Sequence, residues 1–79
     1  MTKSDDLLQA FGQVLRKKRN EANISQEKLA LNSGLDRTYI SLLERGLRQP
    51  TLSTLFTLAE SLGQKPSELI RHLEDGDSN

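Results

Sequence analysis

The stretch of sequence that decides the fold is QEKLALNSGLDRTYISLLER, residues 26–45. It reads as two short helical runs separated at Gly34, the residue type that closes a helix at least cost. A steep crossing of two short helices needs a small residue at the crossing, a glycine in the turn and apolar residues that hold both helices to a core. Six positions meet these needs: Leu29, Ala30, Gly34, Leu35, Ile40 and Leu43. The pattern favours a helix-turn-helix over an ordinary helical hairpin with a glycine cap.

Apolar residues on both sides of this stretch recur at helical spacing and predict three further helices. They are Leu7, Leu8, Phe11, Val14, Leu15 and Ala22 before it, and Leu52, Leu55, Leu58, Ala59, Leu62, Leu69, Ile70 and Leu73 after it. Ser25, Asp36 and Thr51 are expected N-caps, and Pro66 suits a first helical position.

We therefore expect an all-α fold, a compact five-helix bundle that makes residues 1–79 a single domain. The helices are predicted over about 5–22, 26–33, 37–45, 52–62 and 66–74. Residues 75–79 are predicted to form a frayed acidic tail.

Basic residues are concentrated in the middle of the chain, although the formal net charge is zero. Residues 16–48 hold eight basic and four acidic side chains, a local charge of +4, whereas residues 68–79 carry −3. The local field matters more for phosphate binding than the total charge. The basic region suits a nucleic-acid surface, and charge alone leaves a mixed, solvated surface as the alternative.

The chain lacks the side chains on which most enzymes and metal sites depend. It has no cysteine, and His72 is its only histidine. Disulfides, catalytic triads and the usual metal sites are therefore unavailable. No apolar run approaches the roughly 20 residues that span a bilayer. We expect a cytoplasmic protein with no catalytic activity, cofactor, metal or small-molecule effector.

Four segments resemble the phage-repressor and Cro-like family, also called the XRE family. They are Ser25–Ala30, Ser33–Ser41, Leu43–Gly46 and Pro50–Leu52, within a likeness that covers about Phe11–Leu69. Within the family, Leu35–Ser41 with Glu44–Gly46 is similar to the controller proteins of restriction–modification systems. The resemblance implies a lambda-repressor-like fold and a nucleoid-associated transcriptional regulator that binds a palindromic double-stranded DNA operator as a homodimer. The alternative is a helix-turn-helix antitoxin or adaptor whose main partner is a protein.

The third predicted helix is expected to enter the major groove. Because Ile40 and Leu43 face the core, helical geometry turns the remaining side chains of this helix outward. The family motif places the same residues outward, and the predicted base contacts are Arg37, Thr38, Ser41 and Leu42. Arg37 is the strongest candidate because its planar fork matches guanine O6 and N7. The alternative for Arg37 is a contact with a backbone phosphate. Leu42 is expected either to contact thymine methyl groups or to contact no base.

Four residues on or near this helix are predicted to contact backbone phosphates; such contacts position a protein on DNA without reading the base sequence. Gln26 resembles the family glutamine that touches phosphate beside the recognition helix. Arg45 and Arg48 flank Gly46, and a minor-groove contact is the alternative for Arg48. The Tyr39 hydroxyl is a further candidate, although its ring would instead pack over the second helix if it turned inward.

The resemblance also implies an internal ion pair between Arg19 and Glu44. Arg19 is therefore expected to be structural although it belongs to the basic run Arg16–Arg19. Arg16, Lys17 and Lys18 are expected to form a solvated face and are not predicted to contact DNA.

The last two predicted helices offer apolar side chains for a second copy of the chain. By resemblance Leu69 faces its own core, which leaves Ile70 and Leu73 for a two-fold partner. Phe56 is a further candidate because it breaks the apolar face of the fourth helix. The predicted dimer interface is thus Phe56, Ile70 and Leu73, the alternative being that Phe56 packs internally.

Overall fold

The computed structural model describes residues 3–74, and of residues 3–5 the backbone only. Its helices are α1 (Lys3–Glu21), α2 (Gln26–Ser33), α3 (Arg37–Glu44), α4 (Leu52–Ser61) and α5 (Pro66–Glu74). The described residues contain no strand. The expected all-α architecture of five helices is confirmed. The tail predicted over residues 75–79 lies outside the described residues.

Three of the helices end or begin one or two residues away from the sequence prediction. α1 begins two residues earlier than expected and ends one residue earlier. It ends there because Asn23 takes a left-handed conformation, with φ of 63°, which an α-helix does not continue. α3 and α4 each end one residue earlier, because Arg45 and Leu62 are C-cap residues.

Two of the three predicted N-caps form a side-chain hydrogen bond. Ser25 Oγ accepts from the Lys28 N–H at 3.0 Å. Thr51 Oγ1 accepts from the Thr54 N–H at 3.1 Å. Asp36 occupies the N-cap of α3 in an extended conformation, but its side chain makes no cap bond. The prediction for Asp36 was right in position and wrong in bonding, so α3 is held in place by its buried residues.

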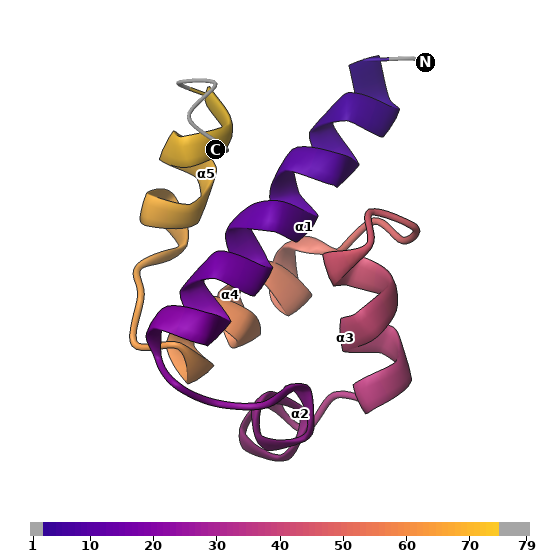
Figure 1. Cartoon of the computed structure of the whole chain (residues 1–79). Coiled ribbons are helices and arrows are strands. Elements are labelled where there is room, and N and C mark those ends of the chain that lie inside the picture. The colour runs from indigo at the N-terminus through magenta and orange to yellow at the C-terminus, as the bar shows by residue number, and fades with distance from the viewer. Residues whose placement is uncertain (1–2, 75–79) are drawn as a thin grey trace.

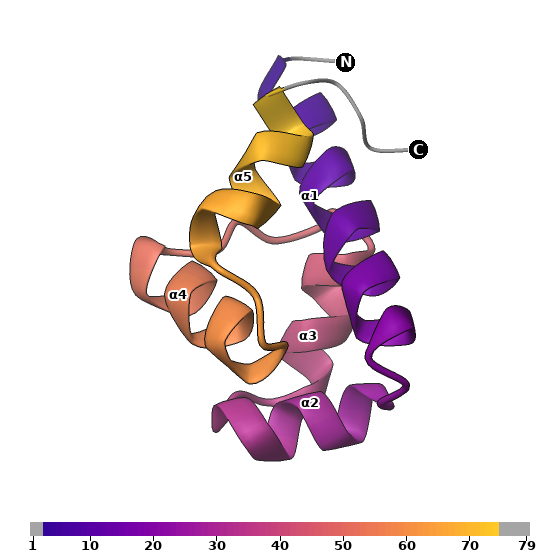
Figure 2. The same ribbon diagram turned by 90° about the vertical axis from the view of Figure 1, so that its left-hand side faces the viewer.

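The helices form a closed ring of contacts. α1 packs against α3 and α5, α2 packs against α3 and α4, and α4 packs against α5. In Figure 1 α1 runs from the N-terminus down towards α2, with α5 on one side of it and α3 on the other. The turned view in Figure 2 shows α2 lying across the base, below α3 and α4. The first and last helices are therefore neighbours, and the core lies inside the ring.

The core of the described chain is built from apolar side chains, and it contains no buried polar or charged residue. Its fully buried large side chains come from all five helices and are Leu15, Leu29, Ile40, Leu43, Leu58 and Leu69. Phe11, Val14, Leu55, Ala59 and Leu62 complete it. The predicted inward positions of the helix-turn-helix are thus core residues, and Ala30 and Leu35 pack against them half-buried.

Four residues assigned to apolar helix faces are exposed, and one of them, Ile70, is a predicted dimer residue. Leu7 is 54% exposed and Leu52 is 75% exposed. Leu7 lies near the start of α1, where it lines an open groove beside α5 rather than the core. Leu52 is the first residue of α4, one turn before the buried Leu55. Ala22 follows the end of α1 and is exposed. The spacing of apolar residues identifies the inward face of a helix, but it does not show how far the core extends along that face.

Candidate nucleic-acid interface

A tight turn between α2 and α3 sets the direction of α3. Gly34 ends α2 with φ of 74°, and its N–H donates to the Ala30 carbonyl at 2.9 Å. Ser33 Oγ accepts from the Leu35 N–H at 3.3 Å and so bridges the turn. Figure 1 looks along the axis of α2 while α3 rises steeply up the page, which is the crossing expected of a helix-turn-helix. A Cβ at Gly34 would meet no atom within 4 Å, so the backbone conformation alone calls for glycine.

α3 has one face in the core and another in solvent. Ile40 and Leu43 are fully buried, three residues apart. Arg37 and Thr38, in the first turn of α3, are exposed. Helical geometry therefore leaves the first turn of α3 free to contact a ligand.

Two other predicted base contacts are less accessible than expected. Ser41 and Leu42 are half-buried rather than exposed. Both lie one helical step from a buried residue, so part of each side chain is covered by the same core that holds α3. The expectation that Leu42 is an exposed leucine was wrong. Tyr39 is also half-buried and packs against the core.

An ion pair joins α1 to the end of α3. Arg19 Nε lies 2.6 Å from Glu44 Oε2, and Arg19 Nη2 donates to Glu44 Oε1 at 3.1 Å. The Glu44 side chain is 3% exposed and the Arg19 side chain 11%. The bond to Glu44 raises the pKa of Arg19, against the opposing effect of burial, so the guanidinium stays charged. The structure thus contains the pair that the family resemblance implied.

Two further hydrogen bonds extend this pair into a network. Arg19 Nη1 donates to the Ile24 carbonyl at 2.9 Å, in the loop before α2. Gln26 Nε2, at the start of α2, donates to Glu44 Oε1 at 3.0 Å. The network therefore links α1, the following loop, α2 and α3. The bond between Gln26 and Glu44 was not foreseen from the sequence, since residues 18 positions apart give no periodic signal.

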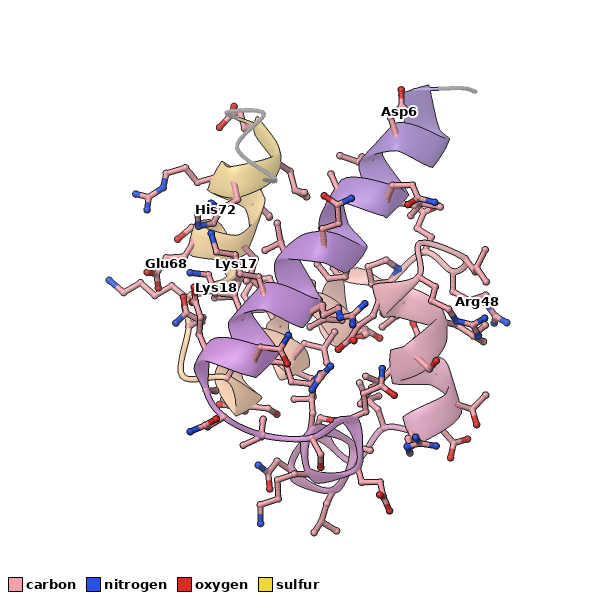
Figure 3. All side chains as sticks on the ribbon, viewed as in Figure 1. Asp6, Lys17, Lys18, Arg48, Glu68 and His72 are labelled. Carbon is pink, nitrogen blue, oxygen red and sulfur yellow. The ribbon has the colours of Figure 1, made fainter. Side chains whose placement is uncertain are left out.

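The remaining basic candidates lie on the α3 side of the molecule. Arg45 and Arg48 are exposed and follow α3 directly. In Figure 3 Arg48 projects beyond α3, whereas Lys17 and Lys18 project on the opposite side, towards α5. Lys18 forms a surface ion pair with Glu21 at 3.6 Å. The two lysines therefore face away from Arg48.

Gly12 is a structural residue that the sequence analysis missed. It is buried in the middle of α1, and a Cβ there would lie 2.5 Å from the Glu44 carbonyl oxygen and 2.6 Å from that of Leu43. α1 and the end of α3 therefore touch through their backbones. A signal was present in the sequence, because glycine inside a helix costs about 1 kcal/mol relative to alanine and needs a reason in packing.

Two of the three predicted dimer residues, Ile70 and Leu73, line an apolar groove. Phe56 is 58% exposed and Ile70 is 44% exposed, so Phe56 does not pack internally. Leu73 is half-buried against the core. A groove of about 420 Å³ runs between α1, α4 and α5 and is lined by Leu7, Leu8, Phe11, Gln49, Pro50, Thr51, Leu52, Leu55, Ile70 and Leu73. Leu69 is fully buried, as expected.

No metal-binding group of three His, Asp or Glu side chains occurs among residues 3–74. His72 lies on α5, on the far side of the molecule from α3 (Figure 3). Within the same residues, no helix combines the length and apolar character that a membrane crossing requires.

Comparison with known proteins links this geometry to a family. A family model described as helix-turn-helix matches residues 15–69. The control protein C.BamHI of Bacillus amyloliquefaciens is 44% identical over 61 residues, which are 76% of this chain and 75% of the relative.

Solved structures give the same result. The restriction–modification controller protein C.AhdI from Aeromonas hydrophila superimposes with a TM-score of 0.77 and 47% identity, over 78% of this chain and 94% of that one. The controller protein C.Esp1396I, solved as a tetramer with its natural 35-base-pair operator, gives 0.79 and 36% identity over 87% and 91%. The chain therefore belongs to the helix-turn-helix family of DNA-binding transcriptional regulators, in its phage-repressor and Cro-like (XRE) branch.

Proposed function

We propose that this DNA-binding regulator recognises a palindromic operator as a homodimer, with α3 of each copy in a major groove. The observation that carries the proposal is the division of α3 into two faces. Ile40 and Leu43 anchor it in the core, while Arg37 and Thr38 stand exposed in its first turn. The first turn of a recognition helix is the part that reaches base edges.

Base recognition is assigned to four residues of α3. Arg37 would contact guanine and Thr38 an adjacent base, since both side chains are exposed. Ser41 and Leu42 are half-buried, so each would offer only its outer part. Ser41 can donate or accept, and the Leu42 methyls suit the methyl group of thymine.

We assign contacts with backbone phosphates to four residues on or near α3. Arg45 and Arg48 are exposed cations next to its C-terminal end, and Gln26 lies at the N-terminal end of α2, where helix N–H groups suit an oxyanion. The Tyr39 ring packs against the core, so only its hydroxyl group would be left to contact phosphate. These contacts set the position of α3 and carry little sequence information.

We assign the dimer interface to the surface that holds the groove between α1, α4 and α5, with Phe56, Ile70 and Leu73 as its central residues. Ile70 and Leu73 line the groove, and Phe56 is exposed on α4, which borders it. A two-fold interface uses the same patch on both copies, so these residues would meet their own counterparts or near neighbours. One recognition helix contacts only a few base pairs, and a second copy of the chain doubles the number of base pairs that are recognised.

Regulation of restriction–modification genes is the biological role that the relatives favour. C.BamHI is named a control protein, and C.AhdI and C.Esp1396I are restriction–modification controller proteins. We infer the same role for this chain, exercised in the cytoplasm at the nucleoid and without catalysis.

Selection from a random pool of DNA duplexes tests the proposed function. The purified protein should enrich a palindrome whose half-sites are about 10 base pairs apart, or a multiple of that. Binding should weaken steeply as salt rises, because phosphate contacts release counterions. Failure to enrich any sequence, with no mobility shift below micromolar protein at moderate salt, would refute operator binding.

A further inference from the structure

We propose that Glu44 positions the side-chain amide of Gln26 for a backbone phosphate, in addition to pairing with Arg19. The inference rests on the proposed operator binding and deepens it. Gln26 would touch the DNA, and Glu44 would act only through Gln26.

The hydrogen bonds fix the orientation of the Gln26 amide. Glu44 Oε1 accepts from Gln26 Nε2 at 3.0 Å and from Arg19 Nη2 at 3.1 Å. An ionised carboxylate only accepts hydrogen bonds, so the amide must turn its NH₂ group towards Glu44 and its carbonyl oxygen elsewhere. A glutamine in open solvent has no such preference. Glu44 therefore selects one of the two amide orientations before DNA arrives.

The selected orientation leaves a donor for an anion. The NH₂ group of Gln26 carries two hydrogens, and one is donated to Glu44. Within residues 3–74 the Gln26 side chain makes no second bond. The first intrahelical bond of α2 is from the Leu29 N–H to the Ser25 carbonyl, and Ser25 Oγ takes the Lys28 N–H. The backbone N–H groups of Gln26 and Glu27 therefore remain beside the amide, on an eight-residue helix.

Charge pairing allows a carboxylate to take this role close to DNA. An unpaired Glu44 would repel the phosphate that Gln26 contacts, since both carry a negative charge. Arg19 binds Glu44 through two nitrogens and is itself tied to the Ile24 carbonyl at 2.9 Å. The pair is neutral as a unit, so it can orient the amide without opposing the DNA.

Two double variants separate this positioning role from a purely structural one. The first combines Arg19→Met with Glu44→Gln, and the second combines Arg19→Met with Glu44→Met. Both remove the charges of the Arg19–Glu44 pair. The Glu44→Met double variant replaces the pair by hydrophobic residues of similar volume, which is often neutral for stability. They differ at residue 44, where Glu44→Gln keeps a carbonyl acceptor for Gln26 and Glu44→Met does not. Thermal melting shows that each is folded at the assay temperature.

The quantity measured is how strongly the affinity for DNA depends on the charge of each single phosphate. A duplex selected from the random pool is made with one neutral methylphosphonate at each backbone position in turn, and Gln26→Met identifies the phosphate that depends on Gln26. At that phosphate the wild type should lose affinity about ten-fold on neutralisation, as expected for a hydrogen bond to a charged group. The Glu44→Gln double variant should lose less, because its amide can also donate and so holds Gln26 in either orientation. The Glu44→Met double variant should lose almost nothing there, while its sensitivity at other phosphates is unchanged.

The outcomes distinguish the inference from the function on which it rests. Full sensitivity in the Glu44→Met double variant would overturn the positioning role, as would equal sensitivity in the two double variants. If Gln26→Met keeps the whole wild-type profile, the phosphate contact of Gln26 is wrong and the inference falls, while operator binding stands. If the wild type binds no duplex, operator binding itself is wrong.

Discussion

A Cβ on Gly12 would lie 2.5 Å from the carbonyl oxygen of Glu44, so α1 and α3 meet here through backbone atoms. We expect Gly12→Ala to destabilise the fold by about 1–3 kcal/mol, the usual cost of overpacking. The gain of about 1 kcal/mol in helix propensity is too small to compensate, because a backbone carbonyl cannot swing away. The measurement is thermal unfolding, where each kcal/mol corresponds to about 4–8 °C for a domain of this size. Gln13→Ala, at the exposed neighbouring position, is the control and should melt like the wild type.

Glu44→Ala should destabilise the fold strongly, because it leaves the charge of Arg19 without its partner in a site where the side chain is 11% exposed. Breaking a buried pair from one side costs about 3–5 kcal/mol. Glu21→Ala is the matched control, since it breaks the surface pair with Lys18 and should cost less than about 1 kcal/mol. Equal melting temperatures for Glu44→Ala and the wild type would mean that the internal pair contributes nothing to stability.

Arg37→Ala and Arg45→Ala should have different effects on DNA binding: the first should change sequence preference, and the second should lower affinity for every sequence. Loss of Arg37 is expected to cost about 1–3 kcal/mol and to relax preference at one base pair of each half-site. Loss of Arg45 should weaken all sequences alike and reduce the dependence of affinity on salt. Titration of the selected duplex and of single-base variants measures both effects. A uniform loss for Arg37→Ala as well would reassign Arg37 to phosphate.

Ile70→Asp should give a folded monomer with much weaker operator binding. Ile70 is 44% exposed beside the apolar groove, and a two-fold interface would bring two new carboxylates close together. Leu31→Asp, on an exposed apolar residue of α2 away from that groove, is the control and should leave the mass unchanged. Sedimentation at micromolar concentration reads the mass of each variant. A dimer of unchanged mass for Ile70→Asp would exclude α5 from the interface.

The sequence predicted what depends on periodicity and on local backbone chemistry. α2 and α5 have the predicted bounds, and the turn at Gly34 has the left-handed conformation that suits glycine. Ile40, Leu43 and Leu69 are buried as expected, because a period of 3.6 residues identifies the inward face of a helix.

The sequence failed where the answer depends on contacts between distant residues. Leu52 fits the period of α4 yet is 75% exposed, because the core ends one turn later. Leu42 was expected in solvent and is half-buried. The approach at Gly12 and the bond between Gln26 and Glu44 each join separate helices, and neither is visible as a repeat along the chain.

The closed ring of helices also bears on how the protein is made. α5 supplies fully buried Leu69 and packs against both α1 and α4, so the ring stays open until this helix has been synthesised. A nascent chain that has emerged only as far as α4 leaves the Leu69 site empty and exposes apolar surface, which for a domain of marginal stability means that it stays largely unfolded. A product of interrupted translation that stops before residue 69 would therefore lack the packed core that holds α3 in place. Closure by the last helix thus restricts DNA binding to chains whose translation has passed that point.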